Sequence, residues 1–244
     1  AEGLVTAAAL RPQRVKKLAS HVLAAGVDVL VIHGTAVSAE HQSRRTEPLN
    51  LKRFIGELDI PVIVGGCASF STALHLMRTG AAGVIVGVGA GLGDDTQREL
   101  GVGVPLATAI ADAAGARMRY LDESGGRYVH VIAHGDLRTG GDIAKAVACG
   151  ADAVMIDSPL AAAVDAPGRG GAWSMDVLHS DLPRGRWMPV SPVGTLEEIL
   201  VGPGSPSGDG PVNIAGALRA AMATTGYASL KEFQKAEVMV TAGR

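Results

Sequence analysis

The sequence predicts an α/β protein whose buried parallel strands alternate with helices, arranged either as a doubly wound sheet or as a (β/α)8 barrel. Small residues, a glycine and an apolar run recur together at 24–34, 79–89 and 148–158. Continuous apolar runs rich in Val and Ile are typical of parallel strands that are buried on both faces. Amphipathic segments separate the runs, and this spacing indicates right-handed βαβ units.

Six apolar runs are expected to form strands: the three repeats and the segments 3–10, 60–66 and 128–135. In each repeat, the glycine before the run fits the end of a helix, and the residues after the run open a loop. The helices expected between the strands span 12–25, 49–58, 70–79, 105–121 and 142–148.

The repeating pattern stops near residue 165. The segment 166–211 is rich in Gly and Pro and has no clear period, so we interpret it as an ordered excursion or a flap. Trp173 and Trp187 are expected to anchor this segment. Thr195, followed three residues later by Glu198, predicts a capping box at the start of a short helix, TLEEIL.

The composition excludes several classes of protein. A net charge of −2 gives no electrostatic case for binding nucleic acid or an anionic membrane. The apolar runs are shorter than a bilayer span, and the first residues lack the pattern of a signal peptide. With 2 cysteines, a disulfide framework is not expected. We therefore expect a cytoplasmic protein without nucleic-acid or membrane partners.

Residues that could carry chemistry lie where the predicted strands end, which is where α/β folds bind ligands. Glycine-rich turns let backbone amides approach a phosphate, and several turns on one face favour a phosphate-bearing ligand. The loop 86–93 does not match the dinucleotide-binding pattern, because position 92 is Leu. For this loop, a tight turn without a ligand is as good an explanation of the glycines as a phosphate site. The strand ends are His33-Gly34-Thr35, Gly65-Gly66-Cys67, 87–93, His134-Gly135-Asp136 and Asp157-Ser158.

Single residues at these ends have two interpretations each. His33 and His134 could be general bases or metal ligands, but we favour polar residues at solvated strand ends. Cys67 could be a reactive thiolate, but a buried inert thiol is favoured. Asp94 and Asp95 could be an acid–base pair, although adjacent acids more often are solvated or stabilise the start of the next helix.

The segment 128–168, YVHVIAHGDLRTGGDIAKAVACGADAVMIDSPLAAAVDAPG, resembles the phosphate-binding half of IMP dehydrogenase and GMP reductase. In that family a strand ends Ala-Asp-Gly-Gly, a helix contains Asp-Ile-Ala-Lys-Ala, and the next strand ends Met-Gly-Ser. GVGVPLATAI, at 101–110, is similar to the segment after the family's catalytic loop. Four further segments are most similar to the IMP dehydrogenase-related branch that lacks the regulatory CBS insert: VSAEH, EPLNLK, YLDESGGRYVHV and GYASLKEFQK.

The family fold is a TIM (β/α)8 barrel, and the resemblance matches the six predicted strands to its third to eighth strands. It therefore implies an incomplete barrel of six βα units, without the first two units. Residues 1–165 would form this partial barrel. Residues 212–244 would complete the single domain with two helices and a possible strand at 237–241. Two strand edges would be exposed, and such edges are prone to pairing. The family also implies a homo-oligomer, a tetramer.

The resemblance implies the IMP dehydrogenase reaction of guanine nucleotide synthesis, in which IMP, NAD and water give XMP and NADH. The family's catalytic Cys falls at Asp94, and a nearby Thr is retained as Thr96. The family's NAD-contacting positions fall at His33, Cys67 and Ile85. A carboxylate cannot replace the thiolate of the family's covalent step. These changes predict eroded or lost catalysis.

The positions that hold the purine nucleotide in the family are also partly changed. Asp136 and Asp157 each replace a glycine, and they place two carboxylates where a dianionic phosphate should bind, which is strongly unfavourable. The nucleotide-binding positions implied by the resemblance are Gly89, Gly91, Leu92, His134, Gly135, Asp136, Asp157 and Ser158.

Two functional hypotheses follow. The first is an IMP dehydrogenase-class oxidoreductase by descent. The second is a non-catalytic paralogue that binds a purine compound or assembles with relatives through the barrel. The residues at 94, 136 and 157 favour the second hypothesis.

Overall fold

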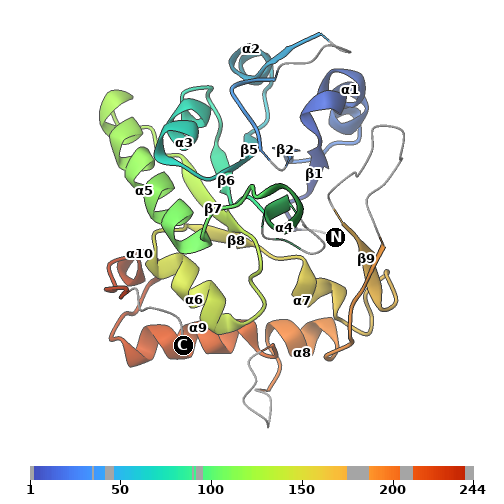
Figure 1. Cartoon of the computed structure of the whole chain (residues 1–244), viewed down its shortest axis with the longest axis vertical. Coiled ribbons are helices and arrows are strands. Elements are labelled where there is room, and N and C mark those ends of the chain that lie inside the picture. Colours follow the sequence, from blue (N-terminus) through green and yellow to red (C-terminus); the bar gives the residue numbers. More distant parts are fainter. Residues whose placement is uncertain are drawn as a thin grey trace.

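A curled sheet of six parallel strands is the centre of the molecule (Figure 1). The computed structural model describes residues 3–34, 36–41, 47–89, 91, 96–174, 187–203 and 211–239. Its strands pair in the order in which they follow along the chain, and all neighbours are parallel. They are β1 (Ala7–Leu10), β2 (Val29–His33), β5 (Val62–Cys67), β6 (Gly83–Val86), β7 (His130–His134) and β8 (Ala153–Met155).

The sheet topology confirms six βα-type strands and an incomplete barrel. Sequential order excludes a doubly wound sheet, in which the strand order reverses. The half-barrel has its two edges at β1 and β8, the first and last of these strands. The middle strands are the most buried, and every side chain of β6 is buried. This burial explains why the middle strands read as continuous apolar runs.

Helices surround the sheet where the sequence predicts them (Figure 1). Several of them begin at polar caps; for example, the hydroxyls of Ser69 and Thr139 accept the amide protons of Thr72 and Asp142. None of the helices in the described ranges has the length and apolar character needed to cross a membrane. The helices along the barrel are η1 (Pro12–Arg14), α1 (Val15–Ala24), α2 (Leu51–Gly56), α3 (Phe70–Met77), α4 (Thr96–Leu100), α5 (Leu106–Glu123), α6 (Gly140–Ala148) and α7 (Ser158–Ala161).

Three further helices follow: α8 (Leu196–Leu200), α9 (Ile214–Thr224) and α10 (Leu230–Phe233). The capping box predicted for TLEEIL is confirmed. The Thr195 hydroxyl accepts the Glu198 amide proton at 3.2 Å, and the Glu198 carboxylate accepts the Thr195 amide proton at 2.8 Å. Helix α9 packs against α6, and so joins the C-terminal part to the barrel.

The Gly- and Pro-rich segment contains a strand pair that the sequence pattern does not predict. Strands β9 (Gly171–Trp173) and β10 (Trp187–Pro189) are antiparallel, and Trp173 lies opposite Trp187. The two indole rings meet edge to face with centroids 5.5 Å apart. Both residues are exposed, at 49% and 44%, so this contact joins the two strands to each other. Three-residue strands are too short to show a period, and the same holds for the two-residue pair β3 (Glu40–His41) and β4 (Leu49–Asn50).

The prediction of a strand at 237–241 is wrong for the three residues of it that the structure describes. Residues 237–239 form no strand, and residues 240 and 241 lie outside the described residues. Val238 and Met239 are 46% and 85% exposed, so their apolar side chains face away from any sheet.

Candidate functional site

The carboxyl ends of β2, β7 and β8 bring three predicted site residues together. His33 ends β2, His134 ends β7, and Asp157 follows β8. The imidazole rings of His33 and His134 meet edge to face with centroids 5.0 Å apart. Nε2 of His134 lies 3.6 Å from Oδ2 of Asp157. Parallel strands end at the same edge of the sheet, and so residues 124 positions apart in the chain become neighbours.

His33 is not a solvated residue, and the interpretation from the sequence is wrong here. Its side chain is buried, and the chain after β2 continues alongside the end of β5. The amide groups of Gly34 and Val37 donate to the carbonyls of Gly65 and Gly66 at 2.9 and 3.0 Å. Burial, helped by the nearby charges of His134 and Arg11, lowers the pKa of His33 to about 4, so the ring is neutral at pH 7.

Asp157 caps the first turn of α7. One carboxylate oxygen, Oδ1, accepts the amide proton of Ser158 at 2.5 Å and the hydroxyl proton of Ser158 at 3.1 Å. Free amide groups at such a turn are the groups that bind phosphate. Here the chain's own carboxylate already occupies the Ser158 amide.

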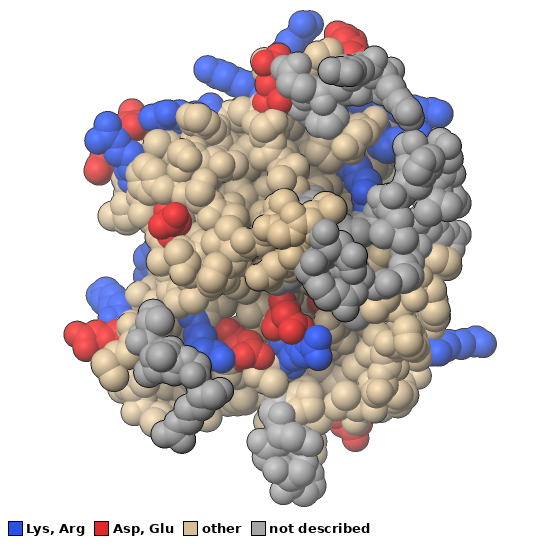
Figure 2. Space-filling model, in the orientation of Figure 1, with Lys and Arg blue, Asp and Glu red and all other residues tan. Residues whose placement is uncertain are grey.

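Asp136 follows β7 and forms an ion pair with Arg138 across one intervening residue. Both side chains are more than half exposed, so the pair contributes little to stability. The Gly135 carbonyl accepts the Leu137 amide proton at 2.8 Å, which folds the chain into a tight turn. Figure 2 shows acidic and basic side chains next to each other on the face that carries α6 and α7.

A cavity of about 420 Å³ lies next to Ser158, between α7 and the segment after β10. We call it the α7 cavity. Its lining includes Arg138 and Gly91 from the loops after β7 and β6. Arg138 is a site residue that the sequence motifs do not indicate, although it lies two residues after Asp136 on the same loop. Strand β10 contributes Met188 and Pro189 to the lining, and the segment after it contributes Ser191 and Val193.

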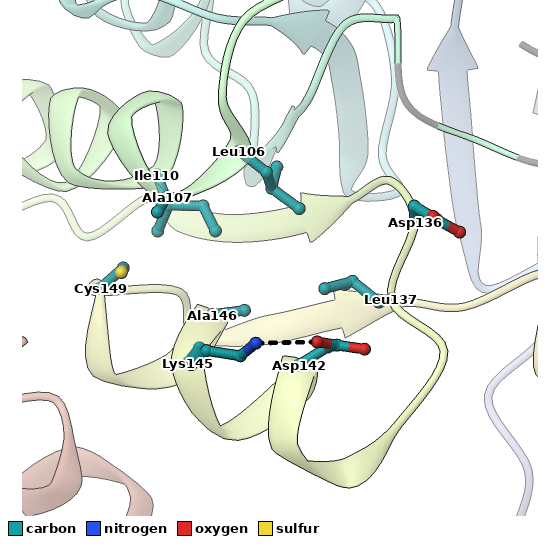
Figure 3. Close-up of a pocket in the computed structure, with 9 residues that line it drawn as sticks. All are labelled: Leu106, Ala107, Ile110, Asp136, Leu137, Asp142, Lys145, Ala146 and Cys149. Atoms are coloured by element: carbon teal, nitrogen blue, oxygen red, sulfur yellow. Dashed lines mark ion pairs between the residues drawn. The ribbon is translucent and has the colours of Figure 1, made fainter. Parts of the chain in front are cut away.

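A smaller cavity of about 210 Å³ lies between α5 and α6 (Figure 3). Leu106, Ile110 and Leu137 form an apolar wall, and Lys145 forms an ion pair with Asp142 at 3.0 Å. Asp136 reaches the edge of this cavity and points away from that pair (Figure 3). Asp136 thus lines the smaller cavity, and Arg138, on the same loop, lines the α7 cavity.

The glycines after β6 are required by the turn itself. Gly87 has φ +138°, and a Cβ atom there would lie 1.8 Å from the carbonyl oxygen of His134. Gly89 has φ +77°, and a Cβ atom there would lie 2.6 Å from the carbonyl oxygen of Val102. Both positions lie in conformations that favour glycine.

The rest of this loop is only partly described. Gly91 lines the α7 cavity, and Thr96 begins α4. Leu92 and Asp94, which the resemblance assigns to the phosphate and the nucleophile, lie outside the described residues, as does Asp95.

The residues that the resemblance assigns to NAD do not offer groups that fit that cofactor. His33, Cys67 and Ile85 are 6%, 2% and 1% exposed, so none presents a polar group to a ribose. The Cys67 thiol donates to the Ile85 carbonyl at 3.4 Å, and burial raises its pKa to about 12. This agrees with the favoured interpretation of Cys67 as a buried, inert thiol. Within the described ranges, no cluster of three His, Cys, Asp or Glu side chains could hold a metal ion.

Comparison with known proteins gives one consistent family. The family model described as "IMP dehydrogenase / GMP reductase domain" matches residues 1–174. An uncharacterized oxidoreductase of Mycolicibacterium smegmatis is 53% identical over 242 residues, which cover 98% of this chain and 64% of that protein. An inosine-5'-monophosphate dehydrogenase of Methanocaldococcus jannaschii is 33% identical over 95% of this chain and 49% of that enzyme.

Solved structures agree with this result. An IMP dehydrogenase/GMP reductase-like protein from Corynebacterium glutamicum superimposes with a TM-score of 0.87 at 48% identity, over 98% of this chain and 62% of that one. GMP reductase from Trypanosoma brucei, as a C318A variant, gives a TM-score of 0.69 at 28% identity over 93% of this chain and 46% of that one. The chain thus spans less than two thirds of the length of these relatives.

Proposed function

The chain belongs to the IMP dehydrogenase / GMP reductase family, and from this premise we propose that it is a member that has lost the family's hydride-transfer reaction. The family typically uses a nicotinamide dinucleotide, NAD(P), and IMP dehydrogenase converts IMP, NAD and water to XMP and NADH. The observation that carries the proposal is the Asp157 carboxylate on the Ser158 amide. It occupies the group that the resemblance assigns to the substrate phosphate.

The electrostatic cost of restoring the nucleotide is large. A phosphate oxygen on the Ser158 amide would compete with Asp157 Oδ1 for the same proton. Two like unit charges about 4 Å apart repel by about 4 kcal/mol at an effective dielectric constant of 20, and a phosphate dianion carries two charges. A typical hydrogen bond to a charged group returns only about 1.5–3 kcal/mol. The repulsion between the Asp157 carboxylate and a phosphate therefore exceeds the free energy gained from one hydrogen bond to that phosphate.

The chemistry of the reaction is also unsupported. The sequence places Asp94 at the nucleophile position, and a carboxylate does not form the thioether adduct from which the family's hydride leaves. His33, Cys67 and Ile85 offer no accessible polar group for the cofactor. The function proposed is that of a non-catalytic paralogue, with a ligand-binding or assembly role on the same barrel face.

The test measures NADH absorbance with the 244-residue chain, IMP and NAD. The IMP dehydrogenase of Methanocaldococcus jannaschii serves as the positive control. We expect no NADH from the wild-type chain or from Asp94→Cys. Catalytic groups act as a set, and one restored residue does not replace the others. Steady turnover by the wild type would overturn the proposal. Turnover by Asp94→Cys alone would show that the rest of the site survives, and would overturn the claim that the whole site is lost.

A further inference from the structure

We propose that the α7 cavity binds an uncharged nucleoside or nucleobase in preference to a nucleotide. This inference rests on the proposed function for the purine class, because family membership supplies that class. The exclusion of the phosphate rests on the contacts of the cavity itself.

The size and lining of the cavity suit an uncharged heterocycle. Its volume of about 420 Å³ falls in the range of about 300–1,000 Å³ that small-molecule sites occupy. Pro159, Met188 and Pro189 give an apolar wall, and a Met side chain adapts to a ring. Ser158 and Ser191 add hydroxyl groups to the same lining. The Ser158 hydroxyl donates its proton to Asp157 and so offers a ligand its acceptor oxygen. Apolar walls with a few polar groups are typical of sites for small, mostly apolar ligands.

In the described lining, two groups that could hold an anion are already bonded to carboxylates of the same chain. The Ser158 amide donates to Asp157 Oδ1. The Arg138 guanidinium, a cation in the cavity lining, forms an ion pair with Asp136. A phosphate would have to displace one of these carboxylates or lie beside it. An uncharged ligand avoids that choice, because it needs neither donor.

The two carboxylates also differ in their exposure to solvent and in the contacts that hold them. Asp136 is more than half exposed and can swing away from Arg138. The Asp157 side chain is 31% exposed, and its two oxygens face Ser158 and His134. Asp157 is therefore the residue that sets the preference against phosphate, and Asp136 has the smaller effect.

Isothermal titration calorimetry with inosine, hypoxanthine, IMP and inorganic phosphate tests the proposal. We expect the wild-type chain to bind inosine at least about tenfold more tightly than IMP, a difference of about 1.4 kcal/mol. Asp157→Asn keeps an oxygen on the Ser158 amide and removes the charge, so the preference for inosine over IMP should fall severalfold. Asp165→Asn is the matched control. The Asp165 carboxylate accepts the Leu196 amide proton at 2.9 Å outside the cavity lining, so this change should leave the ratio unaltered.

A second variant locates the ligand. Ser191 is an exposed residue of the lining, and Ser191→Trp should fill the cavity without disturbing the core and should abolish inosine binding. Several results would overturn the proposal: IMP binding as tightly as inosine, no binding of inosine or hypoxanthine, or unaltered inosine binding by Ser191→Trp. The proposed function fails on a different result, the production of NADH. A chain that makes no NADH but prefers IMP to inosine would overturn this inference alone.

Discussion

Asp152 connects the end of α6 to the C-terminal helix, and its replacement by Asn should cost the fold about 3 kcal/mol. Its carboxylate accepts hydrogen bonds from Arg117 Nη1 at 2.5 Å, from the Tyr128 hydroxyl at 2.6 Å and from the Val131 amide at 2.9 Å. Gln234, just after α10, donates to it at 3.1 Å. These contacts join segments that lie far apart in the chain.

The magnitude follows from burial. The side chains of Arg117 and Asp152 are 7% and 13% exposed. Burial alone would raise the pKa of Asp152, but the hydrogen bonds from Tyr128, Val131 and Gln234 and the Arg117 charge bring that pKa below its ordinary value. Asp152 is thus ionised at pH 7. Removing one partner of a buried ion pair leaves the other charge uncompensated, which costs about 3–5 kcal/mol. Asn retains part of the hydrogen bonding, so we expect the lower end.

Urea unfolding followed by circular dichroism gives the free energy of unfolding for each variant. Glu57→Gln is the control, because Glu57 also forms an ion pair with an arginine, Arg53, at 3.0 Å, but both side chains of that pair are exposed. Breaking an exposed helix pair of this kind should cost only about 0.3–0.5 kcal/mol. If Asp152→Asn costs no more than Glu57→Gln, the network does not stabilise the fold and the reasoning is refuted.

Three further predictions concern the site and the turn beside it. His33 takes up a proton near pH 6.5 in the unfolded chain but only near pH 4 in the folded chain, so the free energy of unfolding should fall by up to about 3 kcal/mol between pH 6.5 and pH 4. His33→Gln should flatten this pH profile of stability. An unchanged profile would contradict the burial argument. Gly87→Ala should lower the free energy of unfolding by at least about 1–3 kcal/mol from backbone strain, and wild-type stability in urea would show that the turn tolerates a Cβ atom. Cys67 should resist iodoacetamide in the native chain at pH 8 and react after unfolding, whereas rapid native alkylation would show that the thiol is accessible.

Local sequence signals account for most of the fold. The runs of Val and Ile at β2, β5 and β6 identify strands without knowledge of their neighbours, because a strand buried on both faces is apolar throughout. The β9–β10 pair leaves no such signal. It depends on contact between Trp173 and Trp187 across thirteen intervening residues.

The sequence predicts where the candidate site lies, but not the burial of its side chains or their hydrogen bonds. Parallel strands end at one edge, and so His33, His134 and Asp157 could be expected at a common face. The burial of His33 depends on the packing of distant strand ends such as that of His134 around it, and the sequence near His33 carries no signal of it. The capping of Ser158 by Asp157 also needed the structure, since an Asp before a Ser fits either a capped turn or a solvated loop.

The central claim, that this chain lacks the family's reaction, is tested most directly by a search for its product. The chain would be incubated with IMP and NAD at a protein concentration equal to that of IMP, so that even one turnover per chain is detectable, and XMP would be quantified by mass spectrometry. The account predicts no XMP above the level of a protein-free sample. XMP that increases in proportion to the amount of protein would contradict it.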